Sequence, residues 1–442
     1  MANLTTPLPQ PVFDESSTTP DPDRFETRHP SDKQLYDQLD EALKTNVVGF
    51  DPSRAKPDEL YGLESALGPH GKEVIKRVEK AGQIIFHAVG DTGSSDVRKY
   101  RNEIHVSDQL ADDFHISKPA AKPAFFYHLG DVVYSFGESK YYYDQFYEPY
   151  RNYPAPIFAI PGNHDSFVIP GTPEDERPLT TFARNFCAIQ TEITPEAGSL
   201  HRTAMTQPGI YFTLDAPFVR IIGLFSNALE DPGLISSEKG TWPGVPDVQL
   251  AFLSAQLERI KKENYAGAVL LATHHPPFTY SPAPKGHGSG GNHGSSATML
   301  REIDSICKAS GIYPHAFLSG HAHNYQRFTR KVRFAGKDLD VPFVVCGNGG
   351  HNVNAIVRPK KGQPAQEPEF GSRVDYLESK PAIEAVRLLL AKYDDRNYGY
   401  LRITVDKRRL AIGFHHVQSG NLLQSRFDLV TVDLANHTIM AN

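Results

Sequence analysis

The chain lacks several features that would place it in particular classes of protein. Its 442 residues include only three cysteines (Cys187, Cys307 and Cys346), none of them in a C-x-x-C pair. This sparse count argues against a disulfide framework and favours a reducing compartment. No apolar run approaches the roughly 18 residues that a membrane-spanning helix needs. The first residues show neither the basic nor the apolar region of a signal peptide, so we expect a cytoplasmic protein without a membrane partner.

A large surplus of charge is also lacking. The formal net charge is -6 over 442 residues, which gives no support to a nucleic-acid partner, because such proteins usually carry a basic patch. No G-x-S-x-G motif is present, so hydrolysis by a nucleophilic serine has no support either. With 39% hydrophobic and 22% charged residues, the composition is typical of a globular protein.

The N-terminal region differs in composition from the rest of the chain. Residues 1–30 are rich in Pro, Ser, Thr and Asp, which is typical of a flexible arm. Two stretches with apolar residues at helical spacing follow, within residues 32–45 and 71–82. We therefore predict that residues 1–82 form a flexible arm with helices.

After Gly82 the pattern changes to short β-prone runs that alternate with helical segments, such as residues 246–263. Near-continuous apolar strands that alternate with helices predict an α/β fold whose strands are covered on both faces. We assign residues 83–418 to one large domain and residues 419–442 to a C-terminal tail.

Several of the predicted strands end in side chains that can bind a metal ion. A single His or Asp after a strand is usually a turn or capping residue. Five strand ends with such donors indicate one shared site, because functional loops gather at the carboxyl ends of strands in α/β sheets. Carboxylate, amide and imidazole donors without a thiolate suit hard or borderline metals. The candidate ligands are Asp91, Asp131, Asn163, His274, His321 and His323.

The number of these donors favours two metal ions, because it exceeds what one ion with an open position needs. Two ions about 3.5–4 Å apart that share a carboxylate can generate a hydroxide and stabilise both oxygens of an in-line displacement. His321 and His323 are two residues apart, so on an extended segment both side chains point the same way, toward neighbouring ions. The adjacent pair His274 and His275 would face opposite sides of a strand, so we expect only one of them to bind metal.

Five short blocks resemble the calcineurin-like metallophosphoesterases and, within that superfamily, the purple acid phosphatases. Each block alone is weak evidence, but five in the same order and spacing are a strong signal. The blocks are DTG (91–93), GDVVY (130–134), GNHD (162–165), LATH (271–274) and GHAH (320–323). The resemblance implies a four-layer αββα sandwich, in which two mixed β-sheets are flanked by helices, and the hydrolysis of phosphate esters.

The resemblance also implies how the ligands divide between two ions. The superfamily usually has Asp-x-His in the first block, whereas this chain has Gly93, and Tyr134 supplies the missing donor in the purple acid phosphatases. A phenolate favours a trivalent ion, so the implied pair is Fe(III) with a divalent Fe, Zn or Mn ion. The alternative for Tyr134 is a packed aromatic side chain. The implied ligands are Asp91, Asp131, Tyr134 and His323 for the first ion, and Asp131, Asn163, His274 and His321 for the second.

The same resemblance suggests residues for catalysis and substrate binding. A metal-bound hydroxide would attack phosphorus, and His164, beside Asp165, would hydrogen-bond the phosphate or protonate the leaving oxygen. His164 and Asp165 are the candidate catalytic residues, and Asn163 and His164 also belong to the candidate substrate-binding set. In related sequences the ligand is the His of H-x-P, which selects His274 over His275.

A Gly-rich loop, residues 281–296, adds His287 and His293 as candidate substrate-binding residues. Substrate-binding histidines are often found in this interval in related enzymes, but the spacing differs here. A solvated loop that does not contact substrate is the alternative.

The leading hypothesis is a dinuclear-metal phosphomonoesterase, an acid phosphatase, that acts on a small phosphorylated substrate. The alternative is a phosphodiesterase of the same superfamily that uses Mn, Zn or Fe on a cyclic nucleotide or another diester. A Ser/Thr protein phosphatase is less favoured, because GDVVYSFG lacks the G-D-x-x-D-R-G motif. A single-iron oxygen enzyme conflicts with the excess of donors, and a catalytically inactive relative should have lost ligands. The sequence leaves the substrate and the oligomeric state open.

Overall fold

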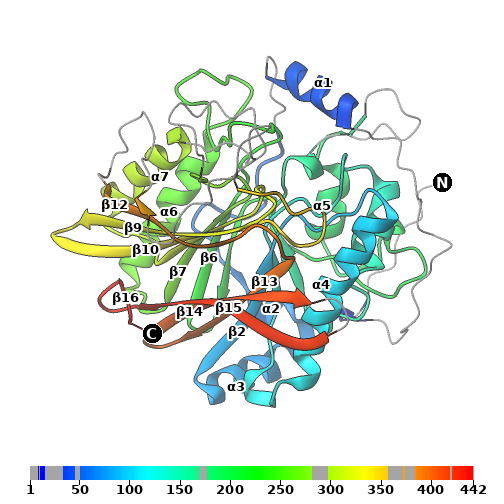
Figure 1. The fold of residues 1–442 in the computed structure, drawn as a ribbon, viewed down its shortest axis with the longest axis horizontal. Helices are drawn as coiled ribbons and strands as arrows, with labels where there is room; N and C mark the ends of the chain where they lie inside the picture. The colour runs from blue at the N-terminus through cyan, green and yellow to red at the C-terminus, as the bar shows by residue number, and fades with distance from the viewer. Residues whose placement is uncertain are drawn as a thin grey trace, which may run out of the picture.

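The computed structural model describes residues 8, 10–14, 33–44, 50–166, 168–169, 177–280, 297–356, 372–373, 383, 385–418 and 421–441. These residues form two β-sheets with helices around them (Figure 1). Both sheets contribute buried side chains to the same hydrophobic core.

One sheet has nine strands in the order β1-β5-β6-β7-β8-β10-β9-β12-β11. Strands β6, β7, β8 and β10 pair in parallel, whereas β9 pairs antiparallel with both β10 and β12. The sheet is therefore mixed, with a parallel centre. The strands are β1 (Tyr61–Gly62), β5 (Phe212–Ala216), β6 (Val219–Leu224), β7 (Ala268–Thr273), β8 (Ala316–Ser319), β9 (Tyr325–Phe334), β10 (Lys337–Cys346), β11 (Ser372–Arg373) and β12 (Ala385–Asp394).

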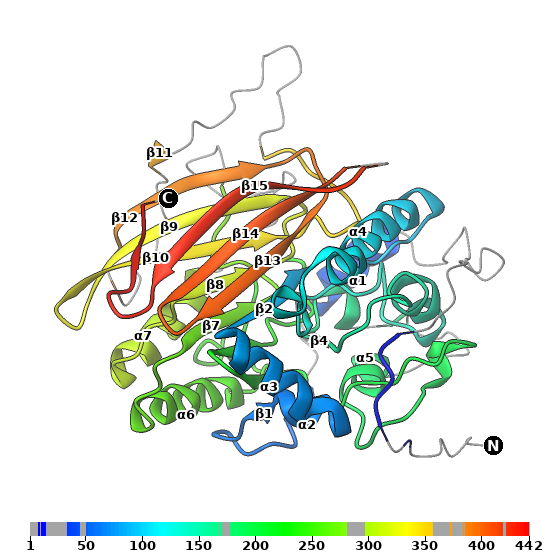
Figure 2. The same cartoon turned by 90° about the horizontal axis from the view of Figure 1, so that it is seen from below.

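The other sheet has seven strands in the order β16-β15-β14-β13-β2-β3-β4. Strands β2, β3 and β4 are parallel neighbours, and the remaining strands are antiparallel (Figure 2). The loops after these three strands therefore leave the sheet side by side, at the carboxyl ends of the strands. The strands are β2 (Gln83–Val89), β3 (Phe126–His128), β4 (Ile157–Ala159), β13 (Gly399–Asp406), β14 (Arg409–Gln418), β15 (Asn421–Asp433) and β16 (Thr438–Ile439).

Helices flank both sheets. The helices α6 and α7 contact each other, and α6 contacts β6 of the nine-stranded sheet, whereas α3 contacts β2 and α4 contacts β14 and β15 of the other sheet. This arrangement is the predicted α/β sandwich of two mixed sheets between helical layers. The α-helices are α1 (Lys33–Leu43), α2 (Leu63–Ala66), α3 (Gly71–Ala81), α4 (Val97–Ile116), α5 (Thr180–Phe186), α6 (Val248–Lys262) and α7 (Ala297–Ser310).

Local sequence explains where several elements begin and end. All six residues of β7, AVLLAT, are buried, as expected for a strand that is covered on both faces. Helix α3 ends at Gly82, which adopts the left-handed conformation that glycine favours. Helix α4 begins after Asp96, whose carboxylate accepts the backbone N–H of Lys99.

The two ends of the chain differ in how closely they follow the sequence-based expectation. The predicted helices within residues 32–45 and 71–82 are confirmed as α1 and α3. The segment 419–442 is not merely a tail, because β15 pairs with β14 along most of its length and β16 pairs with β15. The described side chains of β15 alternate in burial, a pattern weaker than that of the central runs.

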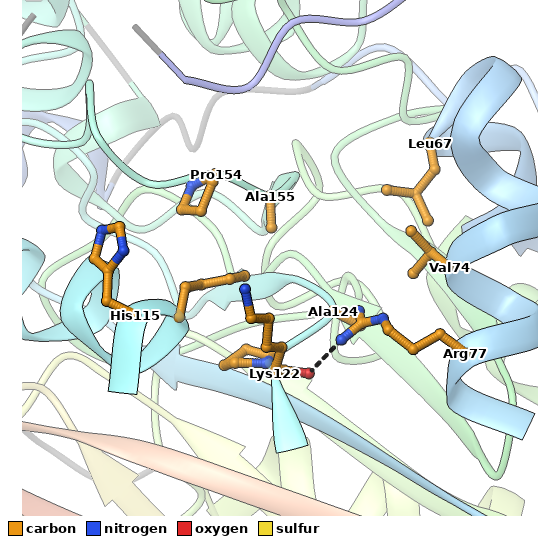
Figure 3. A pocket seen from close by; sticks show the side chains of 10 residues that line it. Leu67, Val74, Arg77, His115, Lys122, Ala124, Pro154 and Ala155 are labelled. Carbon is orange, nitrogen blue, oxygen red and sulfur yellow. Dashed lines mark hydrogen bonds between the residues drawn. The ribbon is translucent and has the colours of Figure 1, made fainter. Parts of the chain in front are cut away.

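A cavity of about 370 Å³ has none of the candidate ligands in its lining, and Figure 3 shows the residues around it. It is lined by Leu67 after α2, by residues of α3 and the end of α4, and by the segments that precede β3 and β4, including Val74, Phe114 and Ala155. These segments enter β3 and β4 at their amino-terminal ends, whereas the candidate ligands follow the carboxyl ends. The cavity is therefore separate from the metal-ligand chemistry.

A buried ion pair supports the strand that begins next to the last candidate ligand. Arg330 of β9 is fully buried, and its two terminal nitrogens each lie 2.8 Å from an oxygen of Asp304 in α7. The same guanidinium donates to the hydroxyl of Tyr313 and to the carbonyl of Ile383. The pair thereby links α7 to β9, which starts two residues after His323.

We predict that Arg330→Met destabilises the protein by about 3–5 kcal/mol, because it leaves the carboxylate of Asp304 buried without its partner. The matched control is Arg333→Met, three residues further along β9, whose ion pair with Asp338 is 61% and 78% exposed. That control should change stability by less than about 1 kcal/mol. Denaturant unfolding measures both effects, and equal stability losses in the two variants would contradict the prediction.

Candidate metal centre

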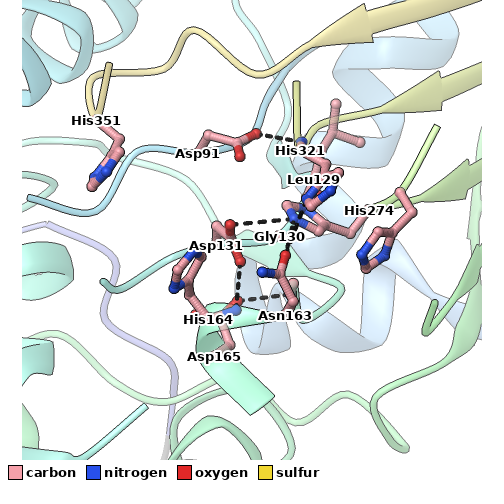
Figure 4. Close-up of polar contacts among 12 residues, drawn as sticks. Asp91, Leu129, Gly130, Asp131, Asn163, His164, Asp165, His274, His321 and His351 are labelled. Atoms are coloured by element: carbon pink, nitrogen blue, oxygen red, sulfur yellow. Dashed lines mark hydrogen bonds and ion pairs between the residues drawn. The ribbon is translucent and has the colours of Figure 1, made fainter. Parts of the chain in front are cut away.

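The candidate ligands lie on loops that follow parallel strands in both sheets. Asp91, Asp131 and Asn163 follow β2, β3 and β4, which are adjacent in the seven-stranded sheet. His274 follows β7, and His321 follows its neighbour β8 in the nine-stranded sheet. Figure 4 shows these side chains converging from the two sheets. The site is therefore built where the carboxyl ends of five strands meet.

One group of ligands surrounds the phenolic oxygen of Tyr134. This oxygen lies 3.0 Å from Oδ1 of Asp91, 2.7 Å from Oδ2 of Asp131 and 3.1 Å from Nε2 of His323. Nε2 of His323 is also 3.4 Å from Oδ1 of Asp91. Four donor atoms thus converge on one point, and they belong to the four residues expected to bind the first ion.

A second group surrounds the side-chain oxygen of Asn163. Nε2 of His274 lies 3.0 Å from Oδ1 of Asn163, and Nδ1 of His321 lies 3.1 Å from the same oxygen. Nε2 of His274 is 3.3 Å from Oδ2 of Asp131, and Asp131, His274 and His321 offer ligand atoms within 4.8 Å of one another. Asp131 therefore belongs to both groups, as a bridging ligand would.

The packing around Gly93 explains why a tyrosine stands in this site. A Cβ atom at Gly93 would lie 2.7 Å from the carbonyl oxygen of Val132 and 2.7 Å from Cα of Val133, so no histidine fits there without moving the next loop. That loop presents Tyr134, whose backbone N–H and carbonyl are both held by the side chain of Gln145, at 2.7 and 2.6 Å. Gln145 was not anticipated from the sequence.

The phenol of Tyr134 is more than a packed aromatic ring. Burial, and then the negative charges of Asp131 and Asp91, raise its pKa well above the usual value. Beside these two carboxylates the neutral phenol is favoured, because its hydroxyl can donate to Asp91 or Asp131. A cation placed between the same oxygens would instead favour the phenolate. The donor set of two carboxylates, a phenol and an imidazole therefore fits a hard metal ion.

Three of the candidate ligands have a backbone conformation that is uncommon outside glycine. Asp91, Asp131 and His321 have positive φ angles of 58°, 55° and 67°, and such strain is concentrated at functional sites. For His321 this corrects the expectation of an extended segment. The bend at His321 sends its ring toward Asn163, while His323 contacts Tyr134.

The charges of the shared carboxylate and its neighbour are coupled. Burial alone would raise the pKa of Asp131, but the charges of His274 and His164 and the hydrogen bonds from His274 and Tyr134 lower it well below its usual range. Burial would lower the pKa of His274, yet Asp131 raises it to about 9. The Nδ1–H of His274 donates to the carbonyl of Leu129 at 2.8 Å, which turns Nε2 toward the ligand group.

The ring nitrogens of His275 are directed to groups other than the ligand atoms, although its ring packs against that of His321 with centroids 4.2 Å apart. Its Nδ1 lies 2.8 Å from the hydroxyl of Ser226 and its Nε2 lies 2.7 Å from the carbonyl of Leu229. Burial lowers its pKa to about 3. This geometry gives His275 a packing role beside His274.

His164 borders both ligand groups. Its backbone N–H donates to Oδ1 of Asp131 at 3.0 Å, and its Nδ1–H donates to the carbonyl of Ser135 at 2.8 Å. Within the described part of the chain, its Nε2 has no hydrogen-bond partner, so this atom is available to a substrate.

Asp165 has a different place from the one expected of a catalytic residue. Its carboxylate accepts the backbone N–H groups of Gly162, Val132 and Val133 at 2.8, 3.2 and 3.1 Å. Burial and the charge of Asp131 raise its pKa to about 7. Its oxygens tie the loop after β4 to the loop after β3, so the geometry gives Asp165 a role in positioning these loops and offers no support for direct catalysis.

His351, which the sequence did not single out, lies against Tyr134. The two rings stack with centroids 3.4 Å apart, and Nδ1 of His351 lies 2.7 Å from the carbonyl of Gly93. Burial, and then the charges of Lys99 and His323, lower its pKa well below the usual value. The sequence signal that could have pointed to His351 was its position in the polar loop that follows β10. His287 and His293 lie outside the described residues.

Comparison with known protein families shows to which family the chain belongs. The family model for calcineurin-like phosphoesterases matches residues 86–325, more than half of the chain, and the chain belongs to that family. A search of curated protein sequences found no match.

Two solved structures are similar to this chain at low identity. GAP50, the anchor in the inner membrane complex of Plasmodium, is 9% identical with a TM-score of 0.44, over 78% of this chain and 89% of its own. A structure of PhoD is 14% identical with a TM-score of 0.43, over 80% of this chain and 70% of its own.

Membership of the family identifies the chain as a metal-dependent phosphoester hydrolase with a dinuclear metal centre. Among the described residues, no helix is long and apolar enough to cross a membrane. The ligand assignment remains a prediction that the geometry supports residue by residue.

We predict that substitutions in the two ligand groups remove metal ions independently of each other. The wild type should bind two ions per chain, His274→Ala one, and Asp131→Ala fewer than one, because only Asp131 belongs to both groups. Elemental analysis after reconstitution measures the stoichiometry. The matched control is His315→Gln, whose ring nitrogens contact the backbone of Val269 and Leu434 and no candidate ligand, and it should retain two ions. A His274 variant that still binds two ions, or an Asp131 variant that does so, would contradict the assignment.

Proposed function

We propose that the protein is a dinuclear-metal phosphatase of the purple acid phosphatase type, which hydrolyses phosphate monoesters at an Fe(III)–M(II) pair, with M being Fe, Zn or Mn. The observation that carries this proposal is the phenolic oxygen of Tyr134, which lies within 3.1 Å of Asp91, Asp131 and His323. A phenolate ligand favours a trivalent ion, and that preference separates this type from the wider family.

When bound, the two ions would supply Lewis acidity for the phosphoryl oxygens and activate a water molecule as the nucleophile. The protein's own groups then fix the geometry of the reaction. Asp131 holds the two positions at a short separation, while the buried loops exclude bulk water, which strengthens electrostatic interactions within the site. Water attacks phosphorus, the bond between phosphorus and the ester oxygen breaks, and the leaving oxygen requires a proton.

His164 is our candidate for the transfer of that proton. Its ring is fixed through Nδ1–H to the carbonyl of Ser135, and Nε2 is the atom available to a phosphate or a leaving group. As a donor, Nε2 stabilises negative charge on the ester oxygen as the bond breaks. Asp165 fixes the loop that carries His164 and takes no part in the proton transfer.

We predict that the iron-loaded protein is purple and that Tyr134→Phe removes the colour. The charge-transfer band of an iron–phenolate pair requires the tyrosine oxygen, which the substitution deletes while it keeps the ring and its stacking on His351. A visible absorption spectrum with elemental analysis, on protein from iron-supplied cells, measures both colour and metal content. A colourless wild type that holds two Mn or Zn ions would refute the iron proposal and favour a general metallophosphoesterase.

We predict that His164→Asn lowers kcat by about 10²–10⁴-fold on an alkyl phosphate monoester. The loss should be much smaller on p-nitrophenyl phosphate, because nitrophenolate leaves without a proton. The control is His70→Ala, an exposed residue before α3, which should leave both rates unchanged. Equal losses on the two monoesters would contradict a proton-donating role.

The same assays distinguish the proposal from a phosphodiesterase. A monoesterase should hydrolyse p-nitrophenyl phosphate faster than bis(p-nitrophenyl) phosphate. The opposite preference would favour the diesterase alternative, with a cyclic nucleotide or another diester as substrate.

A further inference from the structure

Helix α1 lies outside the residues that match the family, yet one of its side chains reaches the metal centre. Figure 1 shows α1 at the top of the molecule, away from α3 at the bottom. The hydroxyl of Tyr36 accepts a hydrogen bond from Nδ2 of Asn163 at 2.6 Å, and Tyr36 is only 3% exposed. A residue of the N-terminal region therefore contacts a candidate metal ligand directly.

A second acceptor contacts the same amide nitrogen. Oε2 of Glu230, in the loop after β6, lies 3.2 Å from Nδ2 of Asn163. The two hydrogens of Nδ2 are thus directed to Tyr36 and Glu230. This arrangement departs from the expectation that the side chain of Asn163 binds substrate, because Nδ2, its only donor atom, already has two protein acceptors.

The chemistry of Glu230 decides which way the amide points. An ionised carboxylate can only accept hydrogen bonds, so it attracts the NH₂ group of Asn163 and repels its carbonyl oxygen. The carbonyl oxygen Oδ1 is consequently directed to the opposite side, where it lies 3.0 Å from His274 and 3.1 Å from His321. With the NH₂ group reversed, Asn163 would have no oxygen to offer a metal ion.

Helix α1 is fastened to the loop that carries Glu230. Oδ1 of Asp40 accepts the backbone N–H of Glu230 at 2.8 Å, and Leu43 packs against the cluster of Leu229, Leu234 and Val245. Tyr36 also stacks on the ring of His164, with centroids 4.1 Å apart and planes inclined by 27°. One helix thereby touches the amide ligand, its neighbour His164 and the loop of the second acceptor.

We propose that Tyr36 and Glu230 are positioning residues for the second metal ion, which orient the amide of Asn163 so that its oxygen is the ligand. They act through Asn163 and do not themselves bind the ion or the substrate. The inference rests on the proposed dinuclear site and adds that α1, though distant in sequence from the motifs, is required to complete it. Partners of metal ligands of this kind typically account for 10–100-fold in metal affinity.

The test is the affinity of the second site for a divalent ion, measured by competition with a chelator on the full chain with its first site loaded with iron. Tyr36→Phe, which keeps the ring on His164, should weaken that affinity by about 10-fold or more. Glu230→Gln is isosteric but allows the amide to reverse, and it should weaken the affinity similarly. In both variants the iron–Tyr134 absorption band should be unchanged, since the first site contains neither residue.

Two controls separate this role from a general effect on folding. Tyr61→Phe removes another tyrosine hydroxyl of the N-terminal region, which lies 2.7 Å from the hydroxyl of Thr206, and it should leave the affinity of the second site unchanged. In an Asn163→Ala background, Tyr36→Phe should cause no further loss, because its effect passes through the amide.

Wild-type affinity in both Tyr36→Phe and Glu230→Gln would overturn the inference while leaving the proposed function intact. A further loss of affinity in the Asn163→Ala background would also overturn it, because Tyr36 would then act by another route. A wild-type chain that binds no second ion would refute the dinuclear proposal itself, and with it the basis of this inference.

Discussion

The carboxylate of Asp131 is the constraint around which the metal centre is arranged. It is 1% exposed, and a buried carboxylate is costly unless hydrogen-bond donors or cations compensate it. The hydroxyl of Tyr134, the backbone N–H of His164 and the imidazole of His274 provide this compensation from three different loops. Asp131 belongs to both ligand groups and would therefore contact both metal ions.

The same crowding explains why glycine occupies two positions of the motifs. A Cβ atom at Gly162 would lie 2.1 Å from Oδ1 of Asp131, and one at Gly130 would lie 2.5 Å from Nδ1 of His274. Each glycine therefore leaves room for a ligand that comes from another loop. These contacts also join the two sheets, because Gly130 belongs to the seven-stranded sheet's loops and His274 to those of the nine-stranded sheet. The sandwich must be correctly assembled before either ligand group exists.

The sequence could predict the features that depend on short segments. Apolar runs that end in Asp91, Asp131, Asn163, His274 and His321 reveal both the strands and the donors at their carboxyl ends, since strand and donor are adjacent in the chain. The pairing of β15 with β14 could not be predicted in the same way, because the described part of β15 is only half buried and its pattern is weak. The left-handed bend at His321 also escaped, since it depends on the packing of its neighbours.

Contacts between distant segments were harder to foresee for a simple reason. Gln145, Glu230 and His351 are ordinary residues in their local sequence, and their importance arises only when the fold brings them to Tyr134 or Asn163. Tyr36 is the extreme case, because it lies in a predicted helix of the N-terminal region, about 50 residues before the first of the motifs that carry the ligands.

The glycine at position 93 and the tyrosine at position 134 are explained by the same packing. The loop that presents Tyr134 passes so close to Gly93 that a side chain at position 93 is excluded, and Gln145 holds that loop in place through both backbone groups of Tyr134. A histidine at position 93 would therefore displace the loop and move the phenol of Tyr134 away from the other ligands. The packing thus leaves the phenol of Tyr134, and not a side chain at position 93, to contact the carboxylates of Asp91 and Asp131.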